Sequence, residues 1–206
     1  MYLASRALRL VNLTNSIPWA IELTHAVQAA GAPTTLWSGM AGTQAGSVVW
    51  STAVASVAEY VALSDSVTSN PDYLRLVQQA GSFVGDVQPD GLNEVIHGEL
   101  TGETQVGTIA SVVNASAVGG KWSAAGAWAI EIADLVVEIT GIPLIVTTGS
   151  AGVMGSFGWI SAVNDPADVD AAGAKLTADP RYMQKLDTAG GLFEPGTTRV
   201  LARRIA

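Results

Sequence analysis

Two short motifs carry side chains whose types and spacing could bind a metal ion. Glu22 and His25 lie three residues apart in a helix-forming segment, and Glu131 and Asp134 repeat that spacing later in the chain. A spacing of three places both side chains of a pair on one face of a helix. Two glutamates, a histidine and an aspartate together would suit iron or manganese. The alternative is the polar face of a packed or interfacial helix. We expect this alternative, with no bound metal, because the fold inferred below separates the two helices.

One strand carries a candidate acid–base pair. His97 and Glu99 are two residues apart, so in a strand they share one face of the sheet. Histidine titrates near neutral pH, and a histidine that faces a cavity could act as an acid or a base. The equivalent position in the second half of the chain is near Ala202, so such a site would exist only once. A structural, hydrogen-bonded histidine is the alternative, and the catalytic residues stay unassigned.

Two tryptophans occupy equivalent predicted strands. Trp50 and Trp159 could line a cavity for a flat apolar ligand, with His97 as its polar group. Core packing is the other common reason for a repeated tryptophan. We expect any such ligand to lie inside the barrel described below, and we expect no cofactor.

A cluster of arginines lies near the C-terminus. Arg199, Arg203 and Arg204 belong to the last predicted strand, and the equivalent strand of the first half carries Glu94 and Glu99. Two interpretations stay open at this point. The arginines form ion pairs between strands, or they bind an anionic substrate.

The chain repeats itself at a constant offset. The tetrapeptide Trp-Ala-Ile-Glu occurs at 19–22 and again at 128–131, an offset of 109 residues. The same offset relates Trp50 to Trp159, Pro71 to Pro180, and Tyr73 to Tyr182. A constant offset over this length indicates two copies of one structural unit. We therefore predict two fused units, residues 1–101 and residues 102–206.

Each copy shows the same predicted order of elements. In the first copy the predicted strands are 3–13, 34–38, 47–54 and 92–100, and the predicted helices are 17–30, 56–66 and 70–81. In the second copy the predicted strands are 104–113, 143–148, 156–163 and 197–205, and the predicted helices are 122–140, 166–176 and 179–189. This is the order of the ferredoxin-like split unit. One face of its antiparallel sheet is uncovered, and pairing two sheets face to face covers both. We predict an α+β fold in which two fused ferredoxin-like βαββαβ repeats form a pseudo-two-fold α+β barrel.

The composition excludes several classes of function. The formal net charge of −8 argues against a nucleic-acid partner, which needs a basic surface. The chain has no cysteine, so disulfides and thiolate chemistry are excluded. No uncharged apolar stretch approaches the roughly 20 residues that span a bilayer, and no apolar run of signal-peptide length follows the first arginines. We expect a cytoplasmic protein without a membrane span.

The scarcity of charge points to self-association. Only 14% of the residues are charged, against about 25% in typical domains, whereas 49% are hydrophobic. The predicted helices 17–30 and 122–140 are apolar on more than one face, and a helix that is apolar all round is buried all round. We therefore predict a homo-oligomer that is held together by these two helices.

Several short motifs resemble those of NIPSNAP-like proteins, which belong to the dimeric α+β barrel superfamily. In the second copy the motifs are Gly158-Trp159-Ile160 and Asp179-Pro180-Arg181-Tyr182. In the first copy they are Val49-Trp50 and Asn70-Pro71-Asp72-Tyr73. The resemblance implies a β-barrel with outer helices and, often, higher oligomers. The superfamily includes cofactor-free monooxygenases, haem enzymes related to chlorite dismutase and many proteins without known activity. It offers no shared catalytic triad to carry over.

Two functions follow from these features. The first is a self-assembling tandem α+β barrel protein with a binding or assembly role, which holds a small apolar ligand in the barrel. The alternative is a cofactor-independent monooxygenase or isomerase that acts on a small apolar substrate. The sequence leaves open whether the protein is an enzyme at all.

Overall fold

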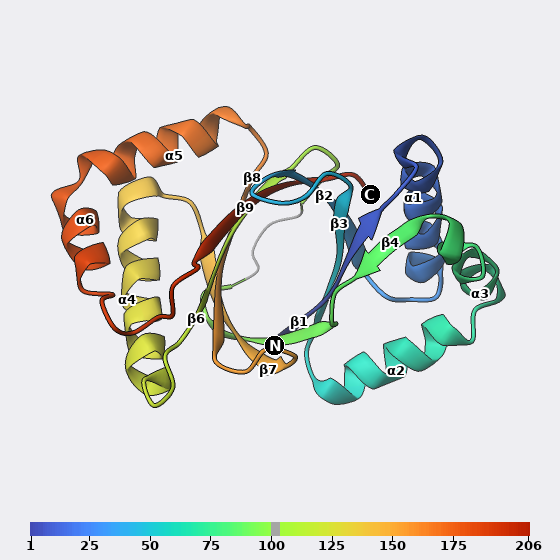
Figure 1. The fold of residues 1–206 in the computed structure, drawn as a ribbon, viewed down its shortest axis with the longest axis horizontal. Helices are drawn as coiled ribbons and strands as arrows, with labels where there is room; N and C mark the ends of the chain where they lie inside the picture. The colour runs from blue at the N-terminus through green and yellow to red at the C-terminus, as the bar shows by residue number, and fades with distance from the viewer. Residues whose placement is uncertain (100–103) are drawn as a thin grey trace.

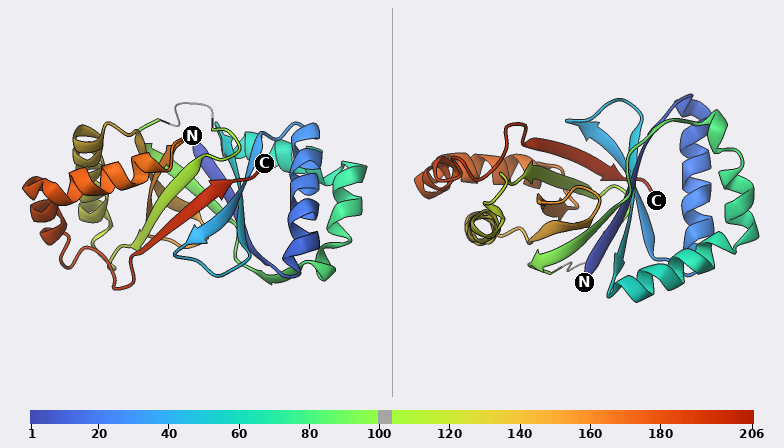
Figure 2. Two further views of the ribbon diagram at one scale, coloured as in Figure 1. Left: turned by 90° about the horizontal axis from the view of Figure 1, so that it is seen from above. Right: turned by 60° about the horizontal axis from the view of Figure 1, so that its bottom comes forward.

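The computed structural model describes residues 1–99 and 104–206. A central β-barrel is flanked on two opposite sides by helices (Figures 1 and 2). The first half contains β1 (Tyr2–Leu10), α1 (Leu13–Ala29), β2 (Thr34–Ala41), β3 (Ser47–Val54), α2 (Val57–Thr68), α3 (Pro71–Val77), a short 3-10 turn (Ala80–Ser82), β4 (Val84–Val87) and β5 (Gly91–His97). The second half contains β6 (Ile109–Ser116), α4 (Trp122–Thr140), β7 (Leu144–Ala151), β8 (Ser156–Val163), α5 (Ala167–Ala178), α6 (Pro180–Asp187) and β9 (Thr198–Arg204).

The last strand of each half joins that half to the other. The strands follow the order β3-β2-β9-β6-β8-β7-β5-β1, and pairing of β1 with β3 closes the ring, while β4 adds to β1. Strand β5 pairs with β1 of its own half and β7 of the other, and β9 likewise pairs with β6 and β2. The predicted α+β barrel of two ferredoxin-like units is confirmed. The predicted boundary between residues 101 and 102 lies outside the described residues.

The apolar core lies outside the barrel, in two layers between the helices and the sheet. In the first layer Trp19, Ala20 and Leu23 of α1 pack against Leu36 and Trp50 of the barrel. The second layer is built from Trp128, Ala129 and Ile132 of α4 with Val146, Phe157 and Trp159 of the barrel. Side chains alternate along a strand, so the residues between these face the barrel interior. The helices therefore cover the outer face of each half of the sheet.

The same hydrogen bond occurs in both layers. Trp19 Nε1 donates to the carbonyl of Leu76 at 3.0 Å, and Trp128 Nε1 donates to the carbonyl of Lys185 at 3.2 Å. In each case the indole of the long helix ties down the short helix of its own half. Leu76 and Lys185 therefore occupy equivalent positions, which becomes important for the site below.

Most element boundaries agree with the sequence analysis, and a few do not. Strands 47–54 and 156–163 and helix 122–140 are as predicted. The helix predicted at 17–30 begins earlier, at Leu13, after Asn12 with a left-handed φ of 53°. The strand predicted at 104–113 starts only at Ile109, because residues 105–108 form a turn that passes through Gly107 at φ 103°. Strand β4 was not anticipated.

The two long helices are partly covered by other helices of the same chain. Helix α3 packs on α1, and α5 and α6 pack on α4. The exposed side of α1 carries polar residues such as Glu22, His25 and Gln28, while Val27 and Val136 are half-buried. A homo-oligomer through helices 17–30 and 122–140 therefore stays a prediction. No helix within residues 1–99 and 104–206 is both long enough and apolar enough for a membrane crossing.

The first layer should be sensitive to loss of a single side chain. Leu76 is 1% exposed at the centre of that layer. We expect Leu76→Ala to lower the free energy of unfolding by about 2–5 kcal/mol, because it removes buried surface and leaves a cavity. Leu74→Ala on the same helix is the matched control. Leu74 is 45% exposed, so its loss should cost no more than about 0.5 kcal/mol. Urea unfolding measures both, and equal costs would contradict the assignment of the core.

The predicted oligomer is tested by mass in solution. Light scattering should give a multiple of the 21.1 kDa chain at micromolar concentration. Val137 is an exposed apolar residue on α4, so Val137→Asp should dissociate the oligomer, because an unpaired charge is costly to bury. Ser64→Asp on α2 is the control and should leave the mass unchanged. A wild-type mass of one chain would refute self-association.

Candidate functional site

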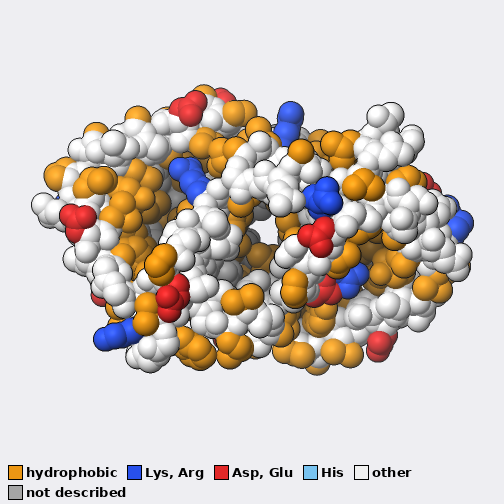
Figure 3. Space-filling view, viewed as in Figure 1, with side chains coloured by type: hydrophobic (Ala, Val, Ile, Leu, Met, Phe, Trp, Pro, Cys, Tyr) orange, Lys and Arg blue, Asp and Glu red, His pale blue; other side chains and the backbone are white. Residues whose placement is uncertain are grey.

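The second half contains a cavity of about 490 Å³ between its helices and the barrel. The barrel wall includes Val113, Leu144, Trp159 and Arg199. The helical wall includes Trp128, Ile132 and Val136 of α4, Leu176 of α5, and Tyr182 and Leu186 of α6. The space-filling view shows apolar side chains gathered in a hollow between α4, α5 and the barrel (Figure 3). The cavity therefore lies outside the barrel, in the same layer as the core of this half.

Local sequence explains how the helical wall is placed. Trp128, Ile132 and Val136 recur every four residues, so they form one stripe along α4. Helix α6 begins with Pro180, and the Asp179 carboxylate caps it by accepting from the backbone N–H of Arg181 at 2.9 Å. Hydrogen bonds from the Arg181 side chain and backbone hold the pKa of Asp179 below its usual value. The cap thus carries a negative charge at neutral pH, which suits a helix N-terminus.

Three aromatic side chains of the cavity lining pack against one another. The Phe193 ring lies 5.3 Å from that of Trp128 and 5.8 Å from that of Trp159, in edge-on arrangements. The two indole N–H groups are already used within the wall. Trp159 Nε1 donates to the carbonyl of Ala129 at 3.0 Å, and Trp128 Nε1 also approaches Thr188 Oγ1 at 2.9 Å. The rings therefore offer a ligand apolar surface rather than hydrogen-bond donors.

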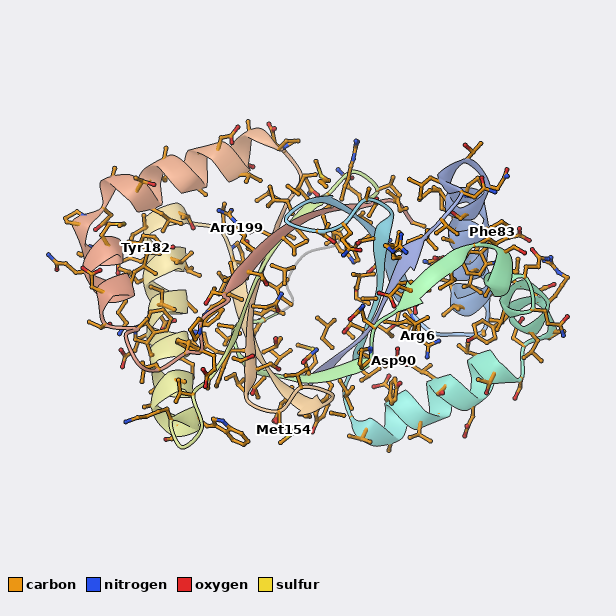
Figure 4. All side chains as sticks on the ribbon, in the orientation of Figure 1. Arg6, Phe83, Asp90, Met154, Tyr182 and Arg199 are labelled. Carbon is orange, nitrogen blue, oxygen red and sulfur yellow. The ribbon has the colours of Figure 1, made fainter. Side chains whose placement is uncertain are left out.

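The charged residues of the cavity lining are exposed to solvent. Arg199 projects from β9, and its Nε donates to Ser111 Oγ at 3.1 Å. Glu194 also lines the cavity, and both charged residues are exposed. Figure 4 shows Arg199 at the barrel edge of the space and Tyr182 on the helical side. The site is thus apolar inside and charged at its entrance.

The corresponding place in the first half carries a different residue, Arg6, whose side chain is 52% exposed. Arg6 lies beside Trp50 in the β1–β3 pair, just as Val113 lies beside Trp159 in the β6–β8 pair. The first half thus has a long arginine side chain where the second half has a valine. It also has the buried Leu76 where the second half has a partly exposed lysine, whose amine reaches Glu131.

A carboxylate holds Arg6 in that place. The Nε and Nη2 of Arg6 donate to the two oxygens of Asp90 at 2.8 and 2.5 Å, and the two residues lie next to each other at the barrel wall of the first half (Figure 4). Asp90 raises the pKa of Arg6 above its usual value, against the opposing effect of partial burial. Tyr73 adds to that rise. Arg6 is therefore a permanent, paired cation in the first half.

A second cavity, of about 450 Å³, lies at one end of the barrel between the two halves. Its lining is more polar and includes Asn93, Asn114, Ser116 and Thr198. Ala115 and Glu194 line both cavities.

The two tryptophans proposed for ligand binding differ in their surroundings. Both face the helices, so neither could line a ligand site inside the barrel as the sequence analysis expected. Trp159 lines the cavity. Trp50 is 8% exposed in the first half, where its Nε1 donates to Thr24 Oγ1 at 2.8 Å.

The proposed acid–base pair is not assembled. Residue Glu99 follows the end of β5 and is exposed, so it does not share a strand face with His97. Instead His97 Nε2 lies 2.7 Å from Asp134 Oδ1. This contact ties β5 of the first half to α4 of the second. Neither residue lines the cavity.

The four candidate metal ligands are held apart. Helices α1 and α4 lie on opposite sides of the barrel (Figure 2). Glu22 pairs with Arg75 at 2.8 Å, and Glu131 pairs with a lysine of its own half. His25 is exposed on α1. Within residues 1–99 and 104–206 no three histidine or carboxylate side chains come close enough to share a metal ion.

Sequence reasoning missed the contrast between Arg6 and Val113. Trp50 and Trp159 are 109 residues apart, but their strand neighbours Arg6 and Val113 are 107 residues apart, because β6 is shifted by two residues relative to β1. A comparison at constant offset aligns Arg6 with Ala115 instead. The sequence analysis did name Arg199, but as one of a cluster that could pair with Glu94 and Glu99. Among the residues that the structure describes, Arg199 has no carboxylate within ion-pairing distance.

Comparison with known proteins supports the fold. No protein family model matches the sequence, and no curated protein matches it. A candidate monooxygenase from Fusobacterium nucleatum has a similar structure, with a TM-score of 0.71 at 8% identity, over 100% of this chain and 92% of its own. An anthrone oxidase-like protein matches equally well, with a TM-score of 0.71 at 12% identity, over 100% and 91%. At such identities the similarity establishes a shared fold.

A NIPSNAP family protein is also among the structural neighbours. This protein, from Agrobacterium tumefaciens, is 18% identical over 46% of this chain and 90% of its own, with a TM-score of 0.40. The assignment of the fold depends on the neighbours that cover the whole chain.

Proposed function

We propose that this protein binds a small, flat, mainly apolar molecule in the cavity of its second half. The observation that carries the proposal is the contrast between the two halves. Beside the strand tryptophan the first half carries the paired Arg6, whereas the second half carries Val113, which lines the cavity. Ligand sites commonly have volumes of about 300–1,000 Å³, and this cavity falls in that range.

The walls favour an aromatic ligand of two or three rings. A molecule that buries on the order of 200 Å² of apolar surface gains about 5 kcal/mol from that burial, before the costs of association. The edges and faces of Trp128, Trp159 and Phe193 provide the complementary contacts. The indole N–H groups of Trp128 and Trp159 already donate to backbone carbonyls, so they are not available to a ligand. This disfavours a ligand whose buried end needs hydrogen bonds.

The second candidate function is a cofactor-independent monooxygenase or isomerase that acts on such a molecule. The neighbours described as a candidate monooxygenase and an anthrone oxidase-like protein favour it. So does the presence of Tyr182, Glu194 and Arg199 along the cavity. In the oxygenase reaction a base removes a proton from an activated C–H group, and the substrate anion transfers electrons to dioxygen. For an anthrone, one dioxygen per substrate yields the anthraquinone and one water.

Copying the ion pair of the first half into the cavity of the second half tests the binding function. The double variant V113R/R199D copies the Arg6–Asp90 pair into the second half, so the new arginine should occupy the cavity. We expect wild-type protein to bind 2-naphthamide once per chain, with quenching of tryptophan fluorescence. The double variant should bind at least about tenfold more weakly and keep its melting temperature within a few degrees.

A control separates occupation of the cavity from the change in net charge. The double variant lowers the net charge by one, and so does Val61→Asp on the exposed face of α2 in the other half, which should bind 2-naphthamide as the wild type does. Unchanged binding by the double variant would place the ligand elsewhere. Absence of binding by the wild type would contradict the proposal itself.

Oxygen uptake distinguishes the two candidate functions. If the protein is an oxygenase, anthrone should consume one equivalent of dioxygen faster than without protein. E194Q and Y182F should then slow the reaction more than they weaken binding, because they remove titratable groups at the cavity. Tight binding of anthrone without faster oxygen uptake would leave a binding role and exclude oxidation of that substrate.

A further inference from the structure

We infer that the ligand carries an anionic oxygen group, such as a carboxylate, and that Arg199 binds this group at the mouth of the cavity. This inference rests on the proposed binding function and narrows its ligand class. It assigns Arg199 as a specificity-determining residue, which selects an anionic ligand over a neutral one of the same shape.

The register of the strands places Arg199 at the position that Asp90 occupies in the first half. Val113 pairs directly with Arg199 across β6 and β9. In the first half the equivalent neighbours are Arg6, on β1, and Asp90, one residue before β5. The first half thus contains both charges of an ion pair. The second half contains one charge, in the place of Asp90, beside an apolar residue in the place of Arg6.

Arg199 differs in this respect from other arginines around the helices. Arg6, Arg75 and Arg181 each contact a carboxylate at 2.8 Å or closer. Acidic residues outnumber basic ones in the chain by 18 to 10, so a missing partner does not reflect a shortage of acids. Glu194 lines the same cavity, but within the described residues it forms no ion pair with Arg199.

Ser111 fixes the position of the free guanidinium. The hydroxyl of Ser111 accepts from Arg199 Nε, which leaves the two terminal nitrogens available. A guanidinium presents donors in a planar fork that matches the two oxygens of a carboxylate. An anionic group held there lies at the cavity mouth, so it keeps some contact with water. The apolar body of the same ligand can then reach inward over Val113 towards Trp159.

A pair of matched probes tests this assignment. 2-Naphthoate and 2-naphthamide have the same ring system and nearly the same shape, but only the first is charged at pH 7.5. We expect wild-type protein to bind 2-naphthoate about tenfold more tightly than 2-naphthamide, because charge-assisted hydrogen bonds contribute more than neutral ones. R199Q should remove this preference and bind 2-naphthamide within about twofold of the wild type.

Two controls make the result specific to Arg199. Arg203 lies four residues further along β9, is exposed, and does not line the cavity, so R203Q should keep the preference. Raising sodium chloride from 0.05 to about 0.5 M should weaken 2-naphthoate binding and leave 2-naphthamide binding unchanged, because salt screens exposed charges.

The outcomes separate this inference from the proposed function. If wild type and R199Q bind both probes equally well, the cavity binds ligands but the anion assignment is wrong. If R203Q loses the preference as well, general surface charge rather than Arg199 is responsible, and the assignment is again wrong. If the wild type binds neither probe, both the proposed function and the assignment fail.

Discussion

Closure of the barrel is the constraint on which the rest of the structure depends. A four-stranded sheet of either half would expose unpaired N–H and C=O groups at its edges, and β5 and β9 remove these edges by pairing across to β7 and β2. In the closed barrel the inner faces of the two sheets face each other across the barrel interior. The large apolar side chains of the strands, including Trp50 and Trp159, therefore face outward, where the helices cover them. A space for a ligand then forms wherever that cover is incomplete.

The incomplete cover arises from small differences between two similar halves. The long helix of each half is fixed by the same indole-to-carbonyl hydrogen bond, so the scaffolds match. What differs is the residue beside the strand tryptophan, which is the paired Arg6 in the first half and Val113 in the second. A valine occupies less of the space between sheet and helices than an arginine does.

The sequence predicts the scaffold far better than the site. The repeated motifs and the apolar periodicity identified the order of elements and the barrel, because both signals are local and recur twice. The position of the cavity depends on which face of a strand meets the helices, and alternation alone does not reveal that for Trp50 and Trp159. It also depends on Val113 lying next to Arg199, two residues far apart in the chain. Likewise His97 and Asp134 belong to different predicted motifs, and only the crossing of β5 into the other half brings them together.

The crossing of the last strands also bears on how such a cavity can evolve. When two separate copies of one chain form a barrel, every substitution falls on both sides, so a residue that fills one cavity fills the other. In a single chain that supplies both sides, Arg6 and Val113 are encoded independently. One side can then become a solid support while the other is free to change its contents. Both halves belong to one closed ring of strands, so one of them can change its side chains while the framework stays the same.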